Sequence, residues 1–549
     1  MRMTQSRQRG GAWRERSVGS VHFSRCAVTF HWYGMFVGPN KSKNDRTMKK
    51  CRLIYNWDGF DCPRMVDYPA SRDKMAELIF GAIIGTPVDT LCFCSGTTDL
   101  FVHQSKVAET ILDVPARFHD RTDVKNLKLL FEQGTDPLRI AVEYGHKAGL
   151  EVFGSFRMND VHHWREPEGM LASRFWKEHR LRHCLNMPEK YWRTGMSGAL
   201  DYKYAEIRER RLAVIKEMIT NYDIDGMELD FRSGPFVFSP SEAGENAPIM
   251  TEFLRTIKKM RKDNSFLLSV LVPHSPLLCR ELGLDLETWI KEGLLEFVAF
   301  GERDLNLPID QFKKIARGTP CGIYPCIGAW SDPKAGEMTR DMYRAWALNF
   351  YEGHVDGLYV FNLYNLNKNT QREILNEIGA PETIQNKRRH HAWYIFPDIP
   401  GERVESKEEM LDRHVYFAHL NQLPSWGADA ENGTWKNVTF KIAENISAEN
   451  KVFGKLCFKL TNVAFGDEIK IKINNNEITG GRIKKEDFTC GRAHPPCGPY
   501  CQYIINLDDG RTVKRGENEL SLFVAKKAKD SGVQTDLFEL EVMVNCAEC

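Results

Sequence analysis

Short apolar runs alternate with stretches of helical periodicity along the first two thirds of this chain, and this alternation constrains the fold more than any other feature. The apolar runs lie at 51–57, 88–94, 151–156, 224–231, 266–273, 295–301, 322–327 and 355–361. The helix-like stretches lie at 71–84, 136–148, 204–222, 247–262, 286–292, 309–317 and 339–352. Such alternation favours a parallel sheet, because parallel neighbours need a crossover that is usually a helix. Eight units predict an α/β fold of the (β/α)8 barrel type; an open doubly wound sheet fits less well, since no Gly-rich turn follows the first run.

The pattern changes near residue 380, and 549 residues are too many for one hydrophobic core. Short segments with period-two alternation follow, separated by turn sequences, at 439–442, 455–461, 468–473, 500–505, 519–524 and 538–544. This pattern predicts a C-terminal all-β sandwich, which either binds carbohydrate or packs on the barrel; packing is favoured because aromatic pairs are scarce on its strands. We expect a basic leader over 1–50 that is disordered or untranslated, the barrel over 51–380, a linker over 381–429 and the sandwich over 430–549.

Charge and cysteine content exclude several classes of function. The formal net charge is +1, so no field of one sign points to nucleic acid or to a membrane surface, and the basic run 387–391 (KRRHH) is interpreted as solvated. No run reaches the roughly 18–20 apolar residues that span a bilayer. Some of the fifteen cysteines fall in predicted strands, where cysteine packs as a small hydrophobe. The spacing of Cys490, His494, Cys497 and Cys501 is not that of a zinc knuckle, so we predict no metal and no cofactor, and leave oligomeric state and cellular location open.

Residues 224–232 (IDGMELDFR) are the most informative run for function. On a strand, the even-numbered residues, which include Glu228 and Asp230, share one face and the apolar side chains share the other. A parallel strand covered by helices has no solvated face, so these two acids must be paired or perturbed for chemistry. Asp230 lies nearer the carboxyl end and is the expected catalytic residue. Glu228, one layer deeper, is either catalytic or a structural partner of Arg157 or Arg232.

Chemistry in a barrel is carried where strands end and loops begin. The expected substrate-binding residues at these ends are Trp57, Asp58, Arg157, Asn159, Asp160, His162, His163, Arg232, His274, Asp304, Trp330 and Asn362. Carboxylates can protonate and attack, amides and Arg can hold hydroxyl groups, and aromatic rings can cover the apolar faces of sugars. The ends therefore predict a carbohydrate pocket, with Asp230, Glu302 and Glu228 as the catalytic set. Arg157 and Asn159 share one parity, so we expect both to face the same pocket as Asp230.

The run 225–231 resembles the fourth-strand motif of the barrel glycoside hydrolases called glycosyl hydrolase-like family 10, and the predicted barrel and sandwich over 51–545 are similar to theirs. The resemblance implies glycosidase activity on a carbohydrate substrate. The run also resembles the D-G-x-D-x-D-x-E signature of family 18 chitinases. Here the chain departs from the pattern, because Arg232 stands in the place of the chitinase proton donor.

The motif is also similar to that of the α-galactosidase clan, in which an Asp nucleophile ends strand four and an acid/base follows strand six. Asp230, with Glu302 or Asp304, would match that arrangement. The leading hypothesis is therefore a glycosidase that cleaves an oligo- or polysaccharide, with Asp230 as nucleophile or base and Glu302 as acid.

Two other functions stay open. The place of Arg232 suggests a carbohydrate-binding barrel without catalysis. The third possibility is a metal-dependent hydrolase, for which the candidate residues are Asp160, His162, His163 and His274. Sugar identity and stereochemical outcome depend on the separation of the carboxyl groups in space, which a sequence does not contain.

Overall fold

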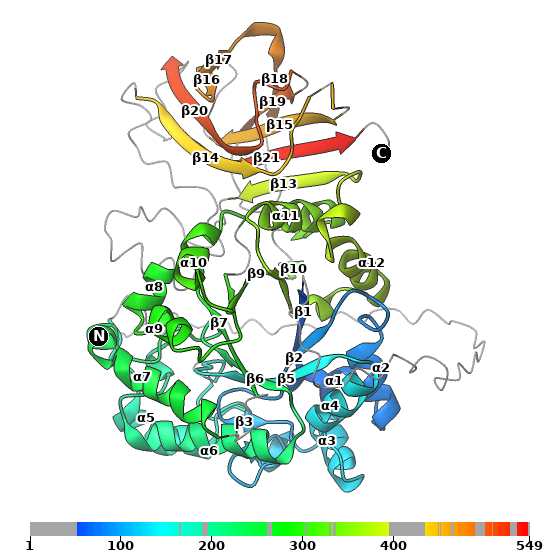
Figure 1. The fold of residues 1–549 in the computed structure, drawn as a ribbon, viewed down its shortest axis with the longest axis vertical. Helices are drawn as coiled ribbons and strands as arrows, with labels where there is room; N and C mark the ends of the chain where they lie inside the picture. Colours follow the sequence, from blue (N-terminus) through cyan, green and yellow to red (C-terminus); the bar gives the residue numbers. More distant parts are fainter. Residues whose placement is uncertain are drawn as a thin grey trace, which may run out of the picture.

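A computed structural model shows a closed barrel with a two-sheet β unit above it (Figure 1). The residues it describes are 52–163, 166–188, 196–260, 266–301, 305–328, 331–332, 336–394, 434–447, 449–450, 452–461, 463, 466–488, 500–507, 509–526 and 535–546.

The barrel consists of eight parallel strands, as the alternation predicts. They are β1 (Arg52–Asp58), β2 (Thr90–Cys94), β5 (Glu151–Arg157), β6 (Gly226–Asp230), β7 (Leu267–Val272), β8 (Phe297–Phe300), β9 (Gly322–Gly328) and β12 (Gly357–Phe361). Each overlaps one predicted run, and strands consecutive in this series are neighbours around the barrel. β6 pairs in parallel with β5 on one side and β7 on the other.

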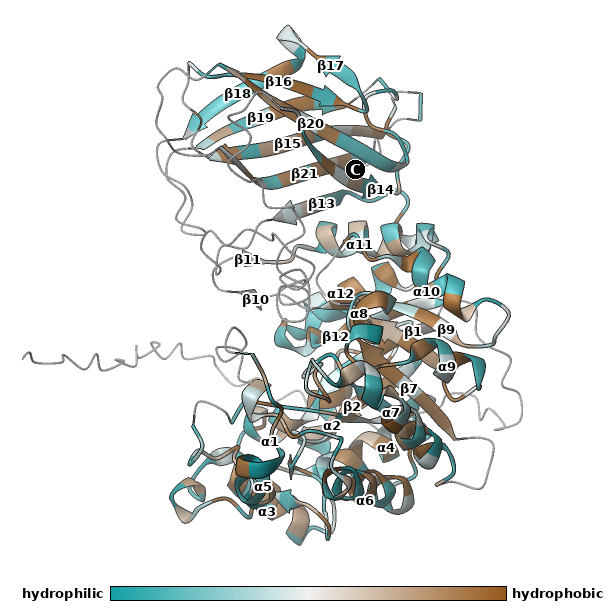
Figure 2. Ribbon diagram, turned by 90° about the vertical axis from the view of Figure 1, so that its left-hand side faces the viewer, coloured by the Kyte–Doolittle hydropathy of each residue, from teal (hydrophilic) through white to brown (hydrophobic). Residues whose placement is uncertain are grey.

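Both faces of the barrel strands are buried. The apolar part of the interior is formed by Ile54, Cys92, Phe153, Leu267, Leu271, Phe297, Ala299, Tyr324, Cys326, Tyr359 and Phe361. The opposite faces pack against the helices in a second, larger core. Figure 2 shows the result as brown, hydrophobic strands inside and helices with teal outer surfaces around them. Burial on both sides explains why these strands read as continuous apolar runs.

Helices follow the strands around the barrel. Those that match predicted stretches are α2 (Arg72–Phe80), α4 (Pro137–Lys147), α6 (Ala205–Asn221), α7 (Ala243–Lys258), α9 (Leu286–Lys291), α10 (Ile309–Ala316) and α11 (Arg340–Glu352). The others are α1 (Cys62–Met65), α3 (Thr122–Glu132), α5 (Arg174–His183), α8 (Pro276–Glu281) and α12 (Lys368–Ile378). Side-chain caps start several of them: Asp136 accepts from the backbone N–H of Arg139 at 2.9 Å at the start of α4. Within the described ranges, none of the helices combines the length and hydrophobicity needed to cross a bilayer.

The upper unit is a sandwich of two antiparallel sheets, as predicted. One has the order β13 (Arg389–Tyr394), β21 (Asp536–Cys546), β15 (Val452–Thr461), β19 (Tyr500–Leu507), β18 (Ile483–Phe488). The other has the order β14 (Lys436–Ile442), β20 (Gly516–Lys526), β16 (Glu468–Ile473), β17 (Asn476–Ile478). Brown and teal alternate along these strands in Figure 2, as expected for one buried and one exposed face.

β13 lies in the stretch where a linker is expected, and it pairs antiparallel with β21. The expectation that the run 387–391 is solvated is wrong for Arg389 and His391, which are both buried. The Arg389 Nε–H donates to Glu444 Oε1 at 2.9 Å, and His391 Nε2 lies 2.9 Å from Glu444 Oε2. Burial alone would raise the pKa of Glu444, but His391 and Arg389 hold it at about 2. The compensating acid comes from a distant part of the chain, so local composition did not reveal it.

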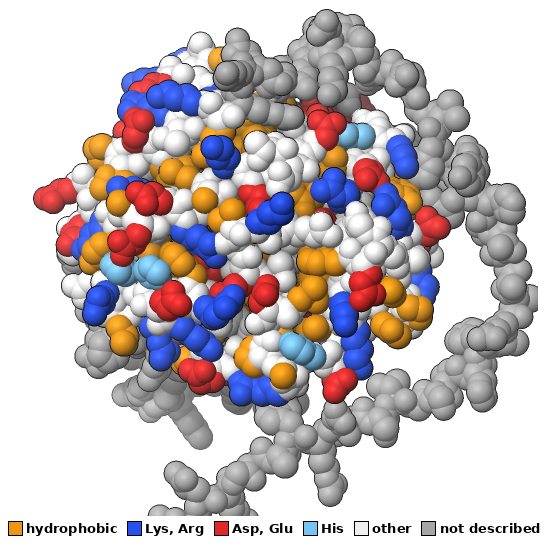
Figure 3. Space-filling view, turned by 90° about the horizontal axis from the view of Figure 1, so that it is seen from below, with side chains coloured by type: hydrophobic (Ala, Val, Ile, Leu, Met, Phe, Trp, Pro, Cys, Tyr) orange, Lys and Arg blue, Asp and Glu red, His pale blue; other side chains and the backbone are white. Residues whose placement is uncertain are grey.

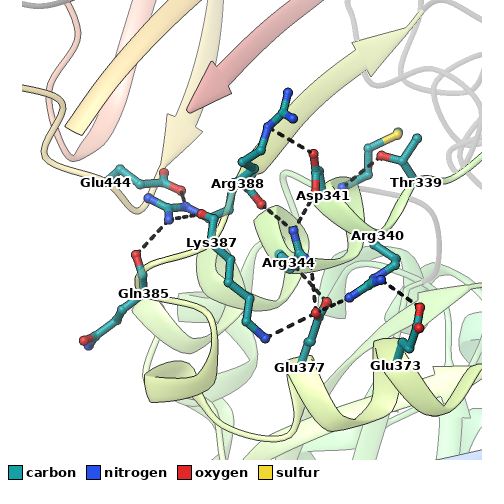
Figure 4. Close-up of polar contacts among 12 residues, drawn as sticks. Thr339, Arg340, Asp341, Arg344, Glu373, Glu377, Gln385, Lys387, Arg388 and Glu444 are labelled. Atoms are coloured by element: carbon teal, nitrogen blue, oxygen red, sulfur yellow. Dashed lines mark hydrogen bonds and ion pairs between the residues drawn. The ribbon is translucent and has the colours of Figure 1, made fainter. Parts of the chain in front are cut away.

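The sandwich is joined to the barrel through α11. Figure 4 shows Glu377 of α12 surrounded by basic side chains, among them Arg344 of α11, whose Nε–H and Nη2–H groups donate to Glu377 at 2.8 and 2.9 Å. Arg344 also donates to the carbonyl oxygen of Arg388, one residue before β13, at 3.1 Å. On the same helix, Asn349 Nδ2–H donates to the carbonyl oxygen of Lys441 in β14 at 2.7 Å. Both sandwich sheets are thus tied to one barrel helix.

Candidate active site at the carboxyl end of the barrel

Charged side chains occupy the barrel interior where β1, β5 and β6 end. Asp58, Arg157 and Asp230 are the last interior residues of these strands, and Arg157 is the register partner of Asp230. Arg157 Nη2 lies 2.5 Å from Asp58 Oδ2. Arg157 and Asp230 are buried, and Asp58 is mostly so. This set is called the mouth below.

A second acid holds the other side of the Arg157 guanidinium. Asp160 Oδ2 lies 2.9 Å from Arg157 Nη1, while Asp160 Oδ1 accepts from the backbone N–H of His162 at 3.0 Å and lies 2.7 Å from its Nδ1. Burial raises the pKa of Asp160, but His162 and Arg157 together hold it below its usual range. The hydrogen bond to Asp160 and its charge raise the pKa of His162 in turn. The His162 side chain is 64% exposed, so a protonatable group stands at the rim of the mouth.

The carboxylate of Asp230 organises the turn after β6. Oδ1 accepts from the backbone N–H groups of Arg232 at 2.8 Å and Ser233 at 2.9 Å, and Oδ2 accepts from the Ser233 hydroxyl. These contacts explain the local sequence, since an Asp that binds backbone two and three residues ahead stabilises a tight turn. They also hold the carboxylate in one orientation.

Arg232 extends across the barrel. Its guanidinium carbon lies 4.7 Å from the centre of the Phe361 ring, at the end of β12. In the strand order, β6 and β12 are four places apart in a barrel of eight, and are therefore opposite each other. The cation–ring contact places a positive charge at the Phe361 ring, on the opposite side of the barrel from Asp230.

Glu228 lies one layer below Asp230 on the same strand and is fully buried. Neither of its carboxyl oxygens has a hydrogen-bond partner of normal geometry. Burial raises its pKa to about 7, and the charge of Asp230 adds to the rise; the neighbouring Ser155 and Tyr359 hydroxyls and the Cys92 thiol act in the opposite direction. A carboxyl group with this pKa exchanges its proton near neutral pH.

Two expected substrate-binding residues, Trp57 and Asn159, use their side chains for contacts within the protein. Trp57 is buried and stacks on Tyr364, with ring centres 4.0 Å apart and planes at 3°; on β1 it has the parity that faces the helices. Asn159 is buried, and its Nδ2–H groups donate to the carbonyl oxygens of Leu200 at 3.1 Å and Phe236 at 2.7 Å. Asn159 therefore anchors two loops, whereas Arg157 faces the mouth as its parity predicts.

Three further candidates have different surroundings. His163 is buried, with its ring centre 4.2 Å from that of Trp176 in α5, and burial lowers its pKa. His274 is half-buried in the turn between β7 and α8. Asn362 adopts a left-handed conformation directly after β12, with φ 54°, and its Oδ1 is buried without a hydrogen-bond partner. Asn362 thus offers an unused acceptor close to the end of β12.

Glu302, Asp304 and Trp330 lie outside the described residues, as do Cys490, His494 and Cys497. Among the residues that the structure does describe, the one group of three potential metal-binding side chains with mutually close donor atoms is His179, His183 and Glu206. The residues considered for a metal-dependent hydrolase are not part of it: Asp160, His162, His163 and His274.

Two polar residues inside the barrel, Asn56 and Tyr359, were not among the predicted site residues. Asn56 lies one layer below Asp58 on β1 and is buried, with no hydrogen-bond partner for its Oδ1. Tyr359 lies on β12 next to Glu228, which raises its pKa further after the larger effect of burial. Asn56 has the parity of Asp58, and that parity is the signal that could have found it. Tyr359 has the parity of Phe361, whose place inside the barrel only the structure shows.

No protein-family model matches the chain, and no curated protein matches it in sequence. Among solved structures, the PgaB (BpsB) glycoside hydrolase domain of Bordetella bronchiseptica is similar at 9% identity and a TM-score of 0.44, over 60% of this chain and 99% of that one. The endo-beta-1,4-mannanase of Thermotoga petrophila is similar at 13% identity and a TM-score of 0.41, over 91% and 99%. A cycloisomaltooligosaccharide glucanotransferase of Paenibacillus sp., at 7% identity and a TM-score of 0.32, is matched over 89% of this chain but only 57% of its own length. Likenesses this distant carry no assignment of activity, which must come from the site itself.

Proposed function

We propose that this chain is a glycoside hydrolase whose active site is the mouth of the barrel. The observation that supports this most is that buried Arg157 and Asp230 end the neighbouring strands β5 and β6, while the mostly buried Asp58 at the end of β1 pairs with Arg157. Buried charges are costly, and in a parallel barrel this end is where catalytic residues lie. Carboxylates held beside the Arg157 guanidinium can accept hydrogen bonds from the hydroxyl groups of a sugar.

Asp230 is the proposed nucleophile or base. Its carboxylate is oriented by the turn at Arg232 and Ser233, so it can act on an anomeric carbon, or on a water molecule, without first reorganising. Asp58, whose Oδ1 has no hydrogen-bond partner, is the proposed acceptor for a sugar hydroxyl. Arg157 keeps Asp58 in place.

Glu302 remains the proposed acid, because it follows the end of β8 closely in the sequence. Glycoside hydrolysis needs one carboxyl group to protonate the leaving oxygen while the other attacks or activates water. Glu228 is too deeply buried to touch a substrate, and we assign it a positioning role. In its protonated form it adds no second negative charge beneath Asp230.

A second candidate function is carbohydrate binding without catalysis. Two observations favour it: both oxygens of Asp230 already accept hydrogen bonds, and Arg232 lies over Phe361 where the chitinase motif has an acid. In this alternative the mouth would hold a sugar, and Arg232 would contribute a donor instead of a proton.

The test is a substrate panel with the purified full-length chain. Oligosaccharides of glucose, mannose, galactose and N-acetylglucosamine with α and β linkages are incubated with wild type and with Asp230→Asn, and products are followed by mass spectrometry. Cleavage by wild type that Asp230→Asn abolishes supports the hydrolase. Sugar binding by calorimetry without cleavage establishes the binding function instead, and absence of both overturns the carbohydrate assignment.

A further inference from the structure

We propose that His179, His183 and Glu206 form a binding site for a divalent transition metal of the zinc class. One donor atom from each of the three side chains lies within 4.8 Å of the other two. His183 Nε2 is 2.6 Å from Glu206 Oε1. The site is separate from the mouth and does not depend on the proposed hydrolase activity.

The backbone brings these side chains together. His179 and His183 are four residues apart on α5, so they share one face of the helix. The chain then pairs with itself: Leu185 N–H donates to Ala199 O at 2.9 Å, and Asp201 N–H donates to His183 O at 2.8 Å. This pairing places Glu206, in the first turn of α6, beside the end of α5.

Both imidazole rings are oriented by groups outside the site. His179 Nδ1 lies 2.8 Å from the carbonyl oxygen of Phe175, which can only accept, so Nδ1 carries the proton and Nε2 has its lone pair free for a metal. The same ring stacks on Phe175, with centres 4.1 Å apart. The His183 ring packs edge-on against Tyr204 at 4.5 Å. A carbonyl that fixes the tautomer of a histidine is the usual support of a metal ligand.

The donor set selects the class of metal. Two imidazoles and one carboxylate suit Zn²⁺ and the neighbouring divalent ions, whereas Ca²⁺ and Mg²⁺ prefer oxygen ligands throughout. The Glu206 side chain is 53% exposed, so a cation can reach the site from solvent, and three protein ligands leave a position for water. Figure 3 views the lower end of the molecule, where α3, α5 and α6 lie in Figure 1; acidic and basic side chains are interspersed there. Binding would therefore rest on these specific ligands and not on a broad negative surface.

A metal at this position would join α5 to α6. α5 belongs to the long insertion after β5, and its Trp176 packs on His163, three residues beyond Asp160, which pairs with Arg157 of the mouth. The metal would thus stabilise the insertion that follows the mouth.

The first test measures zinc binding. The full-length chain is stripped with a chelator, dialysed and titrated with ZnCl₂ against a chromophoric chelator, comparing wild type, the double variant His179→Gln/His183→Gln and the control His354→Asn. His354 is an exposed residue between α11 and β12 with φ 53°, a conformation that Asn also adopts, so the control should bind as wild type does. We expect the double variant to bind one tight equivalent fewer. Since the chain has fifteen cysteines, the difference between variants is decisive, and equal stoichiometry with equal affinity would overturn the site.

The second test guards against a folding defect. Zn²⁺ should raise the melting temperature of wild type and of His354→Asn, and should leave that of the double variant unchanged, while all three melt alike in excess chelator. If the double variant melts early even in chelator, Glu206→Gln takes its place, because it keeps both histidines. Glu206→Gln should weaken zinc affinity by about tenfold or more, because even the loss of a side chain that only supports a metal ligand typically costs that much. An unchanged affinity in Glu206→Gln would contradict the proposal.

Discussion

Arg157 and Asp230 lie side by side at the mouth of the barrel, yet each has its own set of hydrogen-bond partners. They are register partners on β5 and β6. The guanidinium of Arg157 is held by Asp58 and Asp160, whereas the carboxylate of Asp230 is held by the Arg232–Ser233 turn. The positive charge therefore acts on Asp230 while the acid keeps its own orientation. This arrangement leads to predictions that separate catalytic from structural acids.

Asp230→Asn should lower kcat by about three or more orders of magnitude on whichever glycan the panel identifies, because a nucleophile or base acts mainly in the transition state. The matched control is Asp225→Asn, at the other end of the same segment, where Asp225 accepts from Val152 N–H at 2.9 Å and lies 2.9 Å from His146 Nε2. It should keep its turnover and lose about 1–3 kcal/mol of unfolding free energy. Kinetics and urea denaturation on both variants decide the matter. If Asp230→Asn instead loses stability and keeps turnover per folded molecule, Asp230 is structural.

Glu228→Gln should change the dependence of stability on pH. The pKa of Glu228 rises from 4.5 in the unfolded chain to about 7 in the folded protein. As pH increases from 4.5 to 7, the unfolded chain releases this proton first, so the wild type loses stability over that window, by about 3 kcal/mol in total. Gln has no proton to release. Between pH 5 and pH 8, the unfolding free energy of the variant, measured by denaturant titration, should therefore rise relative to that of wild type. If the two free energies change in parallel with pH, Glu228 is not a buried acid with a raised pKa.

Glu377→Ala should destabilise the protein by about 3 kcal/mol, since buried Arg344 loses the acid that accepts from its Nε–H and Nη2–H groups and keeps Asp341 at Nη1. Glu373→Ala, one turn earlier on α12, is the control: that side chain is 52% exposed, against 9% for Glu377, and pairs with Arg340 at the surface. It should cost less than about 1 kcal/mol. Arg344 and Arg340 outweigh burial and lower the pKa of Glu377 to about 2, so its contribution should be lost as pH falls from 4.5 to 2. If thermal and urea unfolding show the same loss of unfolding free energy for Glu377→Ala and Glu373→Ala, the buried cluster around Glu377 does not stabilise the protein.

Gly226→Ala should cost about 1–3 kcal/mol of unfolding free energy. A Cβ at this position would lie 2.6 Å from the carbonyl oxygen of Leu267 and would also clash with the Phe153 ring. The backbone of β7 cannot move away without breaking its pairing with β6. Gly244→Ala in α7, where nothing lies within 4 Å of an added Cβ, should instead gain about 0.5–1 kcal/mol. Chemical denaturation should therefore show a lower unfolding free energy for Gly226→Ala and a higher one for Gly244→Ala, each relative to wild type. A loss in neither variant would contradict the close packing of β6.

Much of the fold was predictable because the barrel strands are buried on both faces, and each therefore appears as an apolar run. α12 and β13 were not found, for two physical reasons. α12 has only a narrow apolar stripe, Ile374, Leu375 and Ile378, among polar residues. β13 begins with charged residues whose burial depends on Glu444, far away in the sequence. Local patterns do not contain such partners.

The candidate site was predictable in its location and less so in its contacts. Strand ends gather at one face of any parallel barrel, so the neighbourhood of Arg157 and Asp230 followed from topology. The contact between Arg232 and Phe361 required closure of the barrel, which brings β6 and β12 to opposite sides of one opening. The pKa of Glu228 likewise depends on its complete burial and on the Ser155, Tyr359 and Cys92 side chains around it, which come from other strands and which strand parity does not give.

The position of β13 restricts how this protein can be divided into fragments for expression. A fragment that begins at residue 430 would lack β13, and β21 would become a bare outer strand whose backbone N–H and C=O groups can recruit another molecule. The same cut would separate Glu444 from both Arg389 and His391. A fragment that ends after β13 would keep Arg389 and His391 with the barrel but would lack their partner Glu444. Cloning boundaries should therefore keep the barrel and the sandwich in one polypeptide, and limited proteolysis between them should yield halves that stay associated.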